Sequence, residues 1–233
     1  MIHNLKPEIT PKEVYRLLGD QSGARLSGKV TDRVTRAICR ANGIINPKIL
    51  FSERDIQKMG HDTLRLNEDI MLKSRHLVQA FHGCEKIVLF LVTIGIEWDL
   101  EIKSLMNHGR MAEAYIWDAV GSVAVEGAIQ GFQDMMDERL ESHGKKTTIR
   151  FSPGYCDWRL EEQKKLFRIL PHDMIGVTLS PGCLMSPRKS ISGSFGIGDQ
   201  RHMNPSRNNP CHVCTMQTCT ARRADRRIQA EVR

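Results

Sequence analysis

The sequence predicts a fold of the α+β or α/β class, in which helices predominate over a few short strands. Lys86–Thr93 is a continuous apolar run rich in branched residues, which is typical of a central strand covered on both faces. Met111–Ser142 predicts one long helix, because Val125, Ala128 and Phe132 belong to an apolar stripe at helical spacing. With 233 residues, of which 40% are hydrophobic and 26% charged, the chain can bury a substantial core.

The other segments alternate between helical and strand patterns, and glycines close several of the helices. The expected shorter helices cover residues 12–19, 30–42, 74–83, 97–107 and 160–170. The expected strands cover residues 45–51, 63–66, 86–93, 173–179 and 189–196. A polar stretch over residues 198–209 predicts a linker.

Three glycines, Gly121, Gly127 and Gly131, interrupt the long helix. Each costs about 1 kcal/mol relative to alanine, so we expect a neighbouring helix or a ligand to approach the backbone closely there. Glu126 stands among them, and a solvated side chain is the ordinary interpretation of a lone glutamate on such a helix.

A proline–glycine turn follows the long helix, in the run Arg150-Phe151-Ser152-Pro153-Gly154-Tyr155. Proline fixes its own φ and glycine permits positive φ, so the run predicts a tight bend that holds Arg150 close to Tyr155. The forked guanidinium suits a carboxylate, and the phenol ring offers stacking area and a cation–π surface. Taken alone, the run also fits an ordinary turn.

A second motif, Met185-Ser186-Pro187-Arg188-Lys189-Ser190-Ile191-Ser192-Gly193, follows further along. An R-x-x-P-G-Y element followed by an M-x-P-x-x-S-(V/I)-S-G element resembles the C-terminal activation domain of cobalamin-dependent methionine synthase, over residues 85–198. The resemblance implies an α+β fold with an antiparallel-rich mixed sheet, flanking helices and one long central helix. It also implies a set of residues that line S-adenosylmethionine, namely Glu126, Arg150, Phe151, Ser152, Pro153, Gly154, Tyr155, Ser190, Ser192 and Gly193.

The resemblance further implies that the protein is a reductive-activation partner of a corrinoid-dependent methyltransferase of methionine biosynthesis. It would bind S-adenosylmethionine and present the methyl group to a cobalamin on another protein, because no D-x-H-x-x-G corrinoid motif occurs here. The cobalamin, reduced by one electron, attacks the methyl group, so the chain itself has no catalytic residue. Expected partners are a corrinoid-binding protein or methyltransferase and an electron donor such as ferredoxin or flavodoxin.

Three departures from that family bear on donor affinity, and the last of them supports an alternative function. Cys156-Asp157-Trp158 replaces Pro-Ala-Cys-Pro after the tyrosine, Gly144 replaces a second glutamate, and a tyrosine after the serine-rich motif has no counterpart. The alternative is a non-catalytic metal- or iron–sulfur-binding adaptor for a corrinoid protein that has lost donor binding. A self-sufficient methyltransferase is disfavoured, since neither a G-x-G-x-x-G loop nor a catalytic-base constellation is present.

The C-terminal stretch contains a C-x2-C-x4-C motif, formed by Cys211, Cys214 and Cys219. Three thiolates in one loop suit zinc or a 4Fe–4S cluster, and the candidate fourth ligands are Cys183, Cys156 and His212. Zinc would be structural, whereas a cluster could deliver the low-potential electron that corrinoid reactivation needs. Unligated thiols and redox disulfides remain alternatives.

We expect residues 1–84 to form an N-terminal helical and mixed region of the same domain, 85–198 the activation-domain core, and 199–233 a linker, cysteine loop and basic tail. The net charge is +7, but no aromatic residue follows Phe195, so nucleic-acid binding is not expected. A basic tail that docks on an acidic partner fits better. Neither a signal peptide nor a run long enough to span a bilayer occurs, which favours a cytoplasmic protein without membrane contact.

Overall fold

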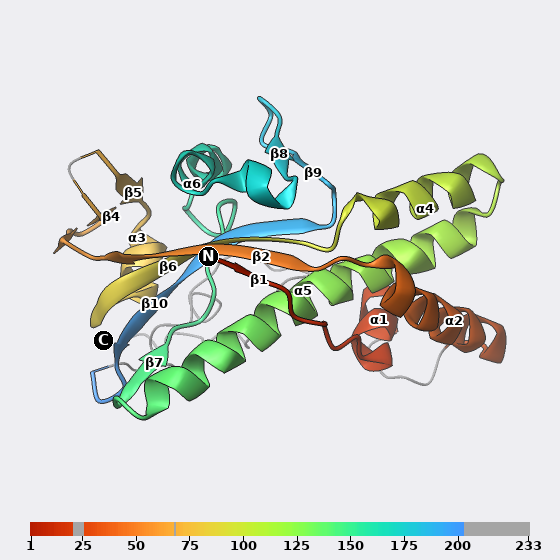
Figure 1. Cartoon of the computed structure of the whole chain (residues 1–233), viewed down its shortest axis with the longest axis horizontal. Helices are drawn as coiled ribbons and strands as arrows, with labels where there is room; N and C mark the ends of the chain where they lie inside the picture. Colours follow the sequence, from red (N-terminus) through yellow and green to blue (C-terminus); the bar gives the residue numbers. More distant parts are fainter. Residues whose placement is uncertain (21–25, 68, 203–233) are drawn as a thin grey trace, which may run out of the picture. The chain divides into compact units, whose positions relative to one another are not determined.

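The computed structural model describes residues 1–20, 26–67 and 69–202, and the statements below concern those residues. The helices are α1 (Pro11–Leu17), α2 (Gly28–Ile44), α3 (Arg75–Ala80), α4 (Ile96–Asn107), α5 (Met111–Glu141) and α6 (Gln163–Ile169), with 3-10 helices η1 (Leu160–Glu162) and η2 (His172–Ile175). The strands are β1 (Ile2–His3), β2 (Lys48–Asp55), β3 (Lys58–Met59), β4 (Thr63–Arg65), β5 (Met71–Lys73), β6 (Cys84–Thr93), β7 (Lys145–Thr147), β8 (Thr178–Leu179), β9 (Met185–Ser186) and β10 (Ser190–Asp199) (Figure 1).

The main sheet has the strand order β1-β2-β6-β10-β7. Strand β1 pairs antiparallel with β2, with Ile2 opposite Leu50, and β7 pairs antiparallel with β10, with Thr147 opposite Ile197. Residues 87–92 of β6 have no exposed surface, as expected for a central strand covered on both faces. The α+β class, with an antiparallel-rich sheet and flanking helices, is therefore confirmed.

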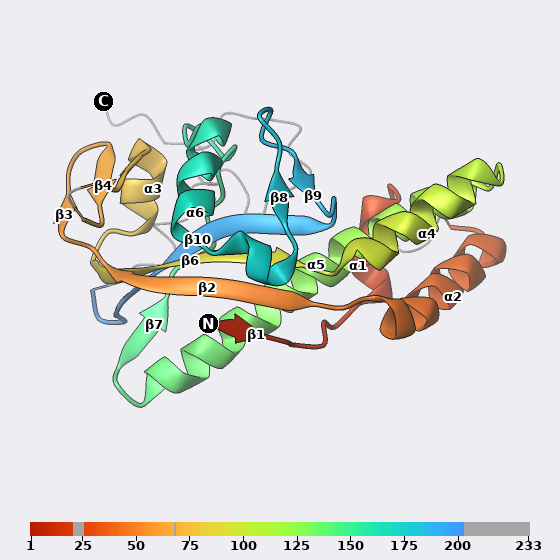
Figure 2. The ribbon, with the colours of Figure 1, turned by 45° about the horizontal axis from the view of Figure 1, so that its top comes forward.

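The chain divides into two compact units. The first contains Met1–Phe51, Leu91–Met135 and Leu170–Ile191, and the second contains Ser52–Phe90, Met136–Ile169 and the described residues from 192 onward. Strands β2, β6 and β10 and helix α5 contribute residues to both units. Figure 2 shows each of these four elements as one continuous ribbon. The sequence-based boundaries after residues 84 and 198 stay a prediction.

In the first unit, packing explains two of the three glycines of α5. A Cβ atom at Gly121 would collide with the indole of Trp98 on α4, and one at Gly127 would collide with the carbonyl oxygen of Glu8. Protein atoms, not a ligand, therefore make these close approaches. A Cβ atom at Gly131 would meet nothing within 4 Å among the described residues, so nothing in the structure explains that glycine.

In the second unit, Asp157 fixes the beginning of α3. Its carboxylate accepts hydrogen bonds from Ser74 Oγ at 2.6 Å, from the Arg75 amide at 2.7 Å and from the His76 amide at 3.3 Å. The Ser74 hydroxyl oxygen accepts in turn from the Leu77 amide at 2.9 Å and so caps the helix. Burial acts to raise the pKa of Asp157, but the hydrogen bonds from Ser74, Arg75 and His76 outweigh it, and the pKa lies below its usual value.

The substitution Asp157→Asn should destabilise the protein by about 1 kcal/mol at pH 7, since it removes a charged acceptor from a helix N-terminus. A depressed pKa in the folded state stabilises only while the carboxyl is ionised, so this contribution fades as the pH falls below the ordinary value of 3.8. Urea unfolding of both proteins at pH 7 and pH 3 measures the effect. A difference between them that is as large at pH 3 as at pH 7 would contradict the assignment.

Some expected elements differ from the observed ones. The strand expected over residues 173–179 is wrong for most of its length, because residues 172–175 form η2 and Gly176, with a φ of +70°, ends that turn before the short strand β8. The linker expected from residue 198 also begins too early, since β10 continues to Asp199 opposite Lys145 of β7. The short strands β1, β3, β5, β7 and β9 were not anticipated. In the described part of the chain, no helix combines the length and apolarity needed to cross a membrane.

Candidate functional site

The Pro153-Gly154 turn is closed by backbone hydrogen bonds. The Tyr155 amide donates to the Ser152 carbonyl at 3.0 Å, and the Gly154 amide donates to the Trp158 carbonyl at 2.7 Å. Gly154 has a φ of +95°, which residues with side chains rarely adopt. The tight bend expected from the sequence is therefore present, and it depends on glycine at this position.

Strand β10 is hydrogen-bonded to Phe151, the residue that leads into this turn. Phe151 and Ser194 exchange two backbone hydrogen bonds, each of 2.8 Å. At the neighbouring position of β10, a Cβ atom on Gly193 would lie 2.7 Å from Ser152 Oγ and 2.9 Å from the Phe151 carbonyl oxygen, so only glycine fits. The end of the second motif, Ser192-Gly193, therefore lies directly against Phe151 and Ser152 of the first motif within the second unit.

Aromatic rings surround the turn. The Phe151 ring is fully buried and stacks on Trp158, with ring centroids 5.9 Å apart and an interplanar angle of 11°. Tyr155 presents its ring at 83° to Phe151, with the centroids 6.2 Å apart. Tyr155 is only half-buried. Of these three rings it is thus the one that keeps accessible surface for a ligand.

Arg150 precedes the turn and is almost completely buried, with 9% of its surface exposed. A guanidinium that is buried to this degree requires hydrogen bonds or an anionic partner to offset its desolvation. Its planar fork of donors matches a carboxylate. Arg150 is therefore a buried residue directly before a turn whose backbone is held from two sides. The closeness of its guanidinium to Tyr155 stays a prediction.

Near the turn, two buried polar side-chain atoms have no hydrogen-bond partner within the described residues. These atoms are the indole nitrogen of Trp158 and Oε1 of Gln163. Gln163, which begins α6, donates from its amide nitrogen to Ser192 Oγ at 3.0 Å. The side-chain oxygen of Gln163 is thus an acceptor without a donor, and the Trp158 indole N–H is a donor without an acceptor.

Sequence reasoning did not select Trp158 or Gln163 as site residues. A signal for Gln163 was present, because it shares the buried face of the amphipathic helix with Leu166, Phe167 and Leu170. A polar side chain on an apolar stripe indicates a specific partner. Trp158 carried no such signal beyond its place after the turn.

Ser190, Ser192 and Ser194 of β10 are buried and hydrogen-bonded. Ser190 Oγ donates to the Pro187 carbonyl at 2.8 Å, and Ser194 Oγ donates to the Phe151 carbonyl at 3.4 Å. Ser190 belongs to the first unit, as does Glu126, which is half-buried on α5. Among the predicted site residues, the structure brings seven together within the second unit, namely Phe151, Ser152, Pro153, Gly154, Tyr155, Ser192 and Gly193.

The predicted metal ligands Cys211, Cys214 and Cys219 lie outside the described residues. Cys183 is buried in the turn between β8 and β9, where its amide donates to the Ser180 carbonyl at 2.9 Å. Within residues 1–20, 26–67 and 69–202, no group of three or more His, Cys, Asp or Glu side chains is arranged to hold a metal ion. Metal binding by the cysteine loop stays a prediction.

Comparison with known proteins places the fold. No protein-family model matches the sequence, and no curated protein matches it significantly. Among solved structures, the chain is similar to the crystal structure of the MetH reactivation domain bound to AdoHcy, with a TM-score of 0.55 and 15% sequence identity. The match covers 86% of this chain and 79% of that one. At this identity the likeness shows a shared fold, and it confirms the fold expected from the paired motifs.

Proposed function

We propose that this protein binds S-adenosylmethionine and presents its methyl group to a cobalamin carried by another protein, as the reductive-activation partner of a corrinoid-dependent methyltransferase. The observation that carries the proposal is the contact between the two motifs in the second unit. Gly193 lies against Ser152 and the Phe151 carbonyl, and the half-buried Tyr155 lies edge-on to the Phe151 ring. Arg150, which is buried, directly precedes Phe151 in the chain. A solved structure of the same fold is bound to AdoHcy, which supports a ligand of this class.

The chemistry of the residues fits the parts of this ligand. Arg150 would receive the carboxylate of the amino-acid end through its forked donors. The Tyr155 ring would face the sulfonium or the adenine, with a cation–π attraction of about 0.5–2 kcal/mol. Glu126 on α5 is a further candidate, as a counter-charge for the ammonium or sulfonium.

The chain's own task in this proposal is to bind and orient the donor. The corrinoid, held by another protein, would supply the cobalt nucleophile that takes the methyl group after a one-electron reduction. The electron would come from a donor such as ferredoxin or flavodoxin. If Cys211, Cys214 and Cys219 hold a 4Fe–4S cluster, that cluster would relay the electron, whereas zinc would serve a structural role.

Calorimetric titration of the protein with AdoHcy tests the proposal. We expect saturable binding, and the variant Tyr155→Leu should weaken it about 3- to 10-fold, because one aromatic contact is lost. Absence of binding at millimolar ligand would overturn the proposal and favour the adaptor function. The second step is checked by following AdoHcy formation from S-adenosylmethionine with reduced cobalamin. Binding without any acceleration of that transfer would contradict the presentation of the methyl group to cobalamin.

A further inference from the structure

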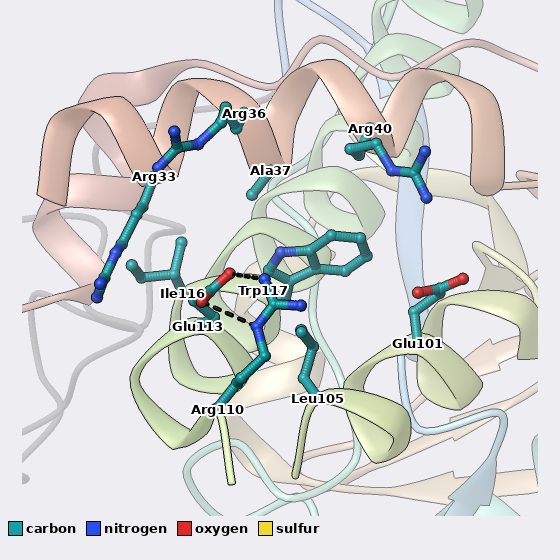
Figure 3. A pocket seen from close by; sticks show the side chains of 10 residues that line it. All are labelled: Arg33, Arg36, Ala37, Arg40, Glu101, Leu105, Arg110, Glu113, Ile116 and Trp117. Atoms are coloured by element: carbon teal, nitrogen blue, oxygen red, sulfur yellow. Dashed lines mark hydrogen bonds and ion pairs between the residues drawn. The ribbon is translucent and has the colours of Figure 1, made fainter. Parts of the chain in front are cut away.

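A pocket of about 240 Å³ lies in the first unit, well away in sequence from both motifs. Its walls come from α2, from α4 and from the first turns of α5 (Figure 3). Arg33, Arg36 and Arg40 share one face of α2 at helical spacing, and Arg110 stands just before α5. Figure 3 shows the arginines of α2 on one side of the pocket and the pair of Arg110 and Glu113 on the other, with Trp117 between them.

The arginines of α2 differ from Arg110 in their partners. Arg110 Nε donates to a Glu113 carboxylate oxygen at 3.0 Å, and its NH2 group contacts the other oxygen. Within the described residues, the guanidinium groups of Arg33, Arg36 and Arg40 make no ion pair or hydrogen bond, and all three residues are exposed. Like charges at this spacing repel one another, so the arrangement disfavours the helix unless an anion sits between them.

The lining carries an excess of positive charge. Four arginines face two carboxylates, those of Glu101 and Glu113, which leaves a formal charge of +2. The pKa of Glu113 is lowered, first by its hydrogen bond with Arg110, against a smaller effect of burial, and then by the charges of Arg110, Arg33 and Arg36. These α2 guanidinium groups therefore exert their field inside the pocket.

The remaining walls are apolar and include Leu105, Ile116 and Trp117. The indole of Trp117 stacks on that of Trp98, with centroids 4.5 Å apart and an angle of 17°. The Trp98 indole nitrogen donates to the Trp117 carbonyl at 3.1 Å, which holds this wall in place. Charges that face an apolar wall are screened less than charges in open water, so they attract an anion more strongly.

We propose that this pocket binds the phosphate or pyrophosphate group of a small phosphorylated molecule. Guanidinium groups bind phosphate oxygens through paired hydrogen bonds, and a charge of +2 matches a dianion. The volume is smaller than that of most pockets for drug-sized ligands, which suits a compact anionic group. An acidic peptide would need an extended basic groove, whereas these residues line one concave pocket.

Calorimetric titration with inorganic pyrophosphate, and separately with inorganic phosphate, tests this proposal. Wild type should bind pyrophosphate, and Arg36→Gln and Arg40→Gln should each weaken the affinity about 10-fold or more. Lys29→Gln removes the same charge from the same helix outside the pocket and should leave the affinity within about 2-fold. Glu101→Gln removes a negative charge from the lining and should strengthen binding several-fold.

The opposite signs expected for Arg36→Gln and Glu101→Gln distinguish a binding role from a structural one, which would weaken binding in both variants. Equal losses in Arg36→Gln, Arg40→Gln and Lys29→Gln would overturn the proposal, because they would indicate unspecific attraction to a basic protein. So would no binding of pyrophosphate by wild type, or binding of a polyglutamate peptide that pyrophosphate does not displace. Pyrophosphate carries no adenosine or amino acid, so these outcomes are independent of the site for S-adenosylmethionine.

Discussion

Replacement of Arg150 by lysine is expected to lower the affinity for AdoHcy about 100-fold, which corresponds to roughly 2.7 kcal/mol. Arg150 is buried beside the turn, and lysine keeps the charge but loses the fork that binds both oxygens of a carboxylate. The affinity for adenosine, which has no carboxylate, should stay nearly unchanged in the same variant. Calorimetry with the two ligands measures this difference.

The control for this experiment is Arg159→Lys. Arg159 lies nearby in the sequence but is exposed, and its guanidinium nitrogen is 3.3 Å from Glu161 at the surface. This variant should bind both ligands as wild type does. Thermal unfolding of each variant shows whether the fold is kept. If Arg150→Lys lowers the melting temperature but weakens AdoHcy and adenosine equally, Arg150 supports the structure and does not bind the carboxylate.

Replacement of Gly193 by alanine should destabilise the protein by about 2–4 kcal/mol and abolish AdoHcy binding at micromolar ligand. The added Cβ would lie 2.7 Å from Ser152 Oγ, 2.8 Å from the Phe90 ring and 2.9 Å from the Phe151 carbonyl oxygen. The Phe151 oxygen belongs to the backbone and the Phe90 ring is packed in the core, so neither can move aside without a large cost in free energy. Urea unfolding and calorimetry on the same preparation measure both effects.

Gly131→Ala provides the matched control with the opposite sign. Gly131 lies inside α5 with nothing within 4 Å of an added Cβ among the described residues, and it is exposed. Alanine there should stabilise the protein by about 0.5–1 kcal/mol, because it favours the helix and restricts the unfolded chain. If Gly193→Ala has the same free energy of unfolding as wild type and still binds AdoHcy, the close contact between the two motifs is not required for stability or binding.

For the candidate site, the sequence predicted the turn but not all of its surroundings. Proline and glycine specify a bend locally, and Gly154 adopts the positive φ that the prediction required. Trp158 and Gln163 were missed, because their unsatisfied polar atoms become evident only when the turn, α6 and β10 are assembled. The arginines of the pocket were also missed, although Arg33, Arg36 and Arg40 repeat at helical spacing, since α4 and α5 complete the lining.

The sequence by itself determined the helices and the central strand of this protein, because 3.6-residue periodicity and continuous apolar runs are local properties. It also carried the paired motifs that predict the fold. Tertiary structure alone decided the short strands β1, β3, β5, β7 and β9, whose two or three residues are too few for a pattern and gain their order from neighbouring strands. Contact between Gly193 and Ser152, like the convergence of four arginines on one pocket, depends on which distant backbones pack together, and no local preference of the chain encodes that choice.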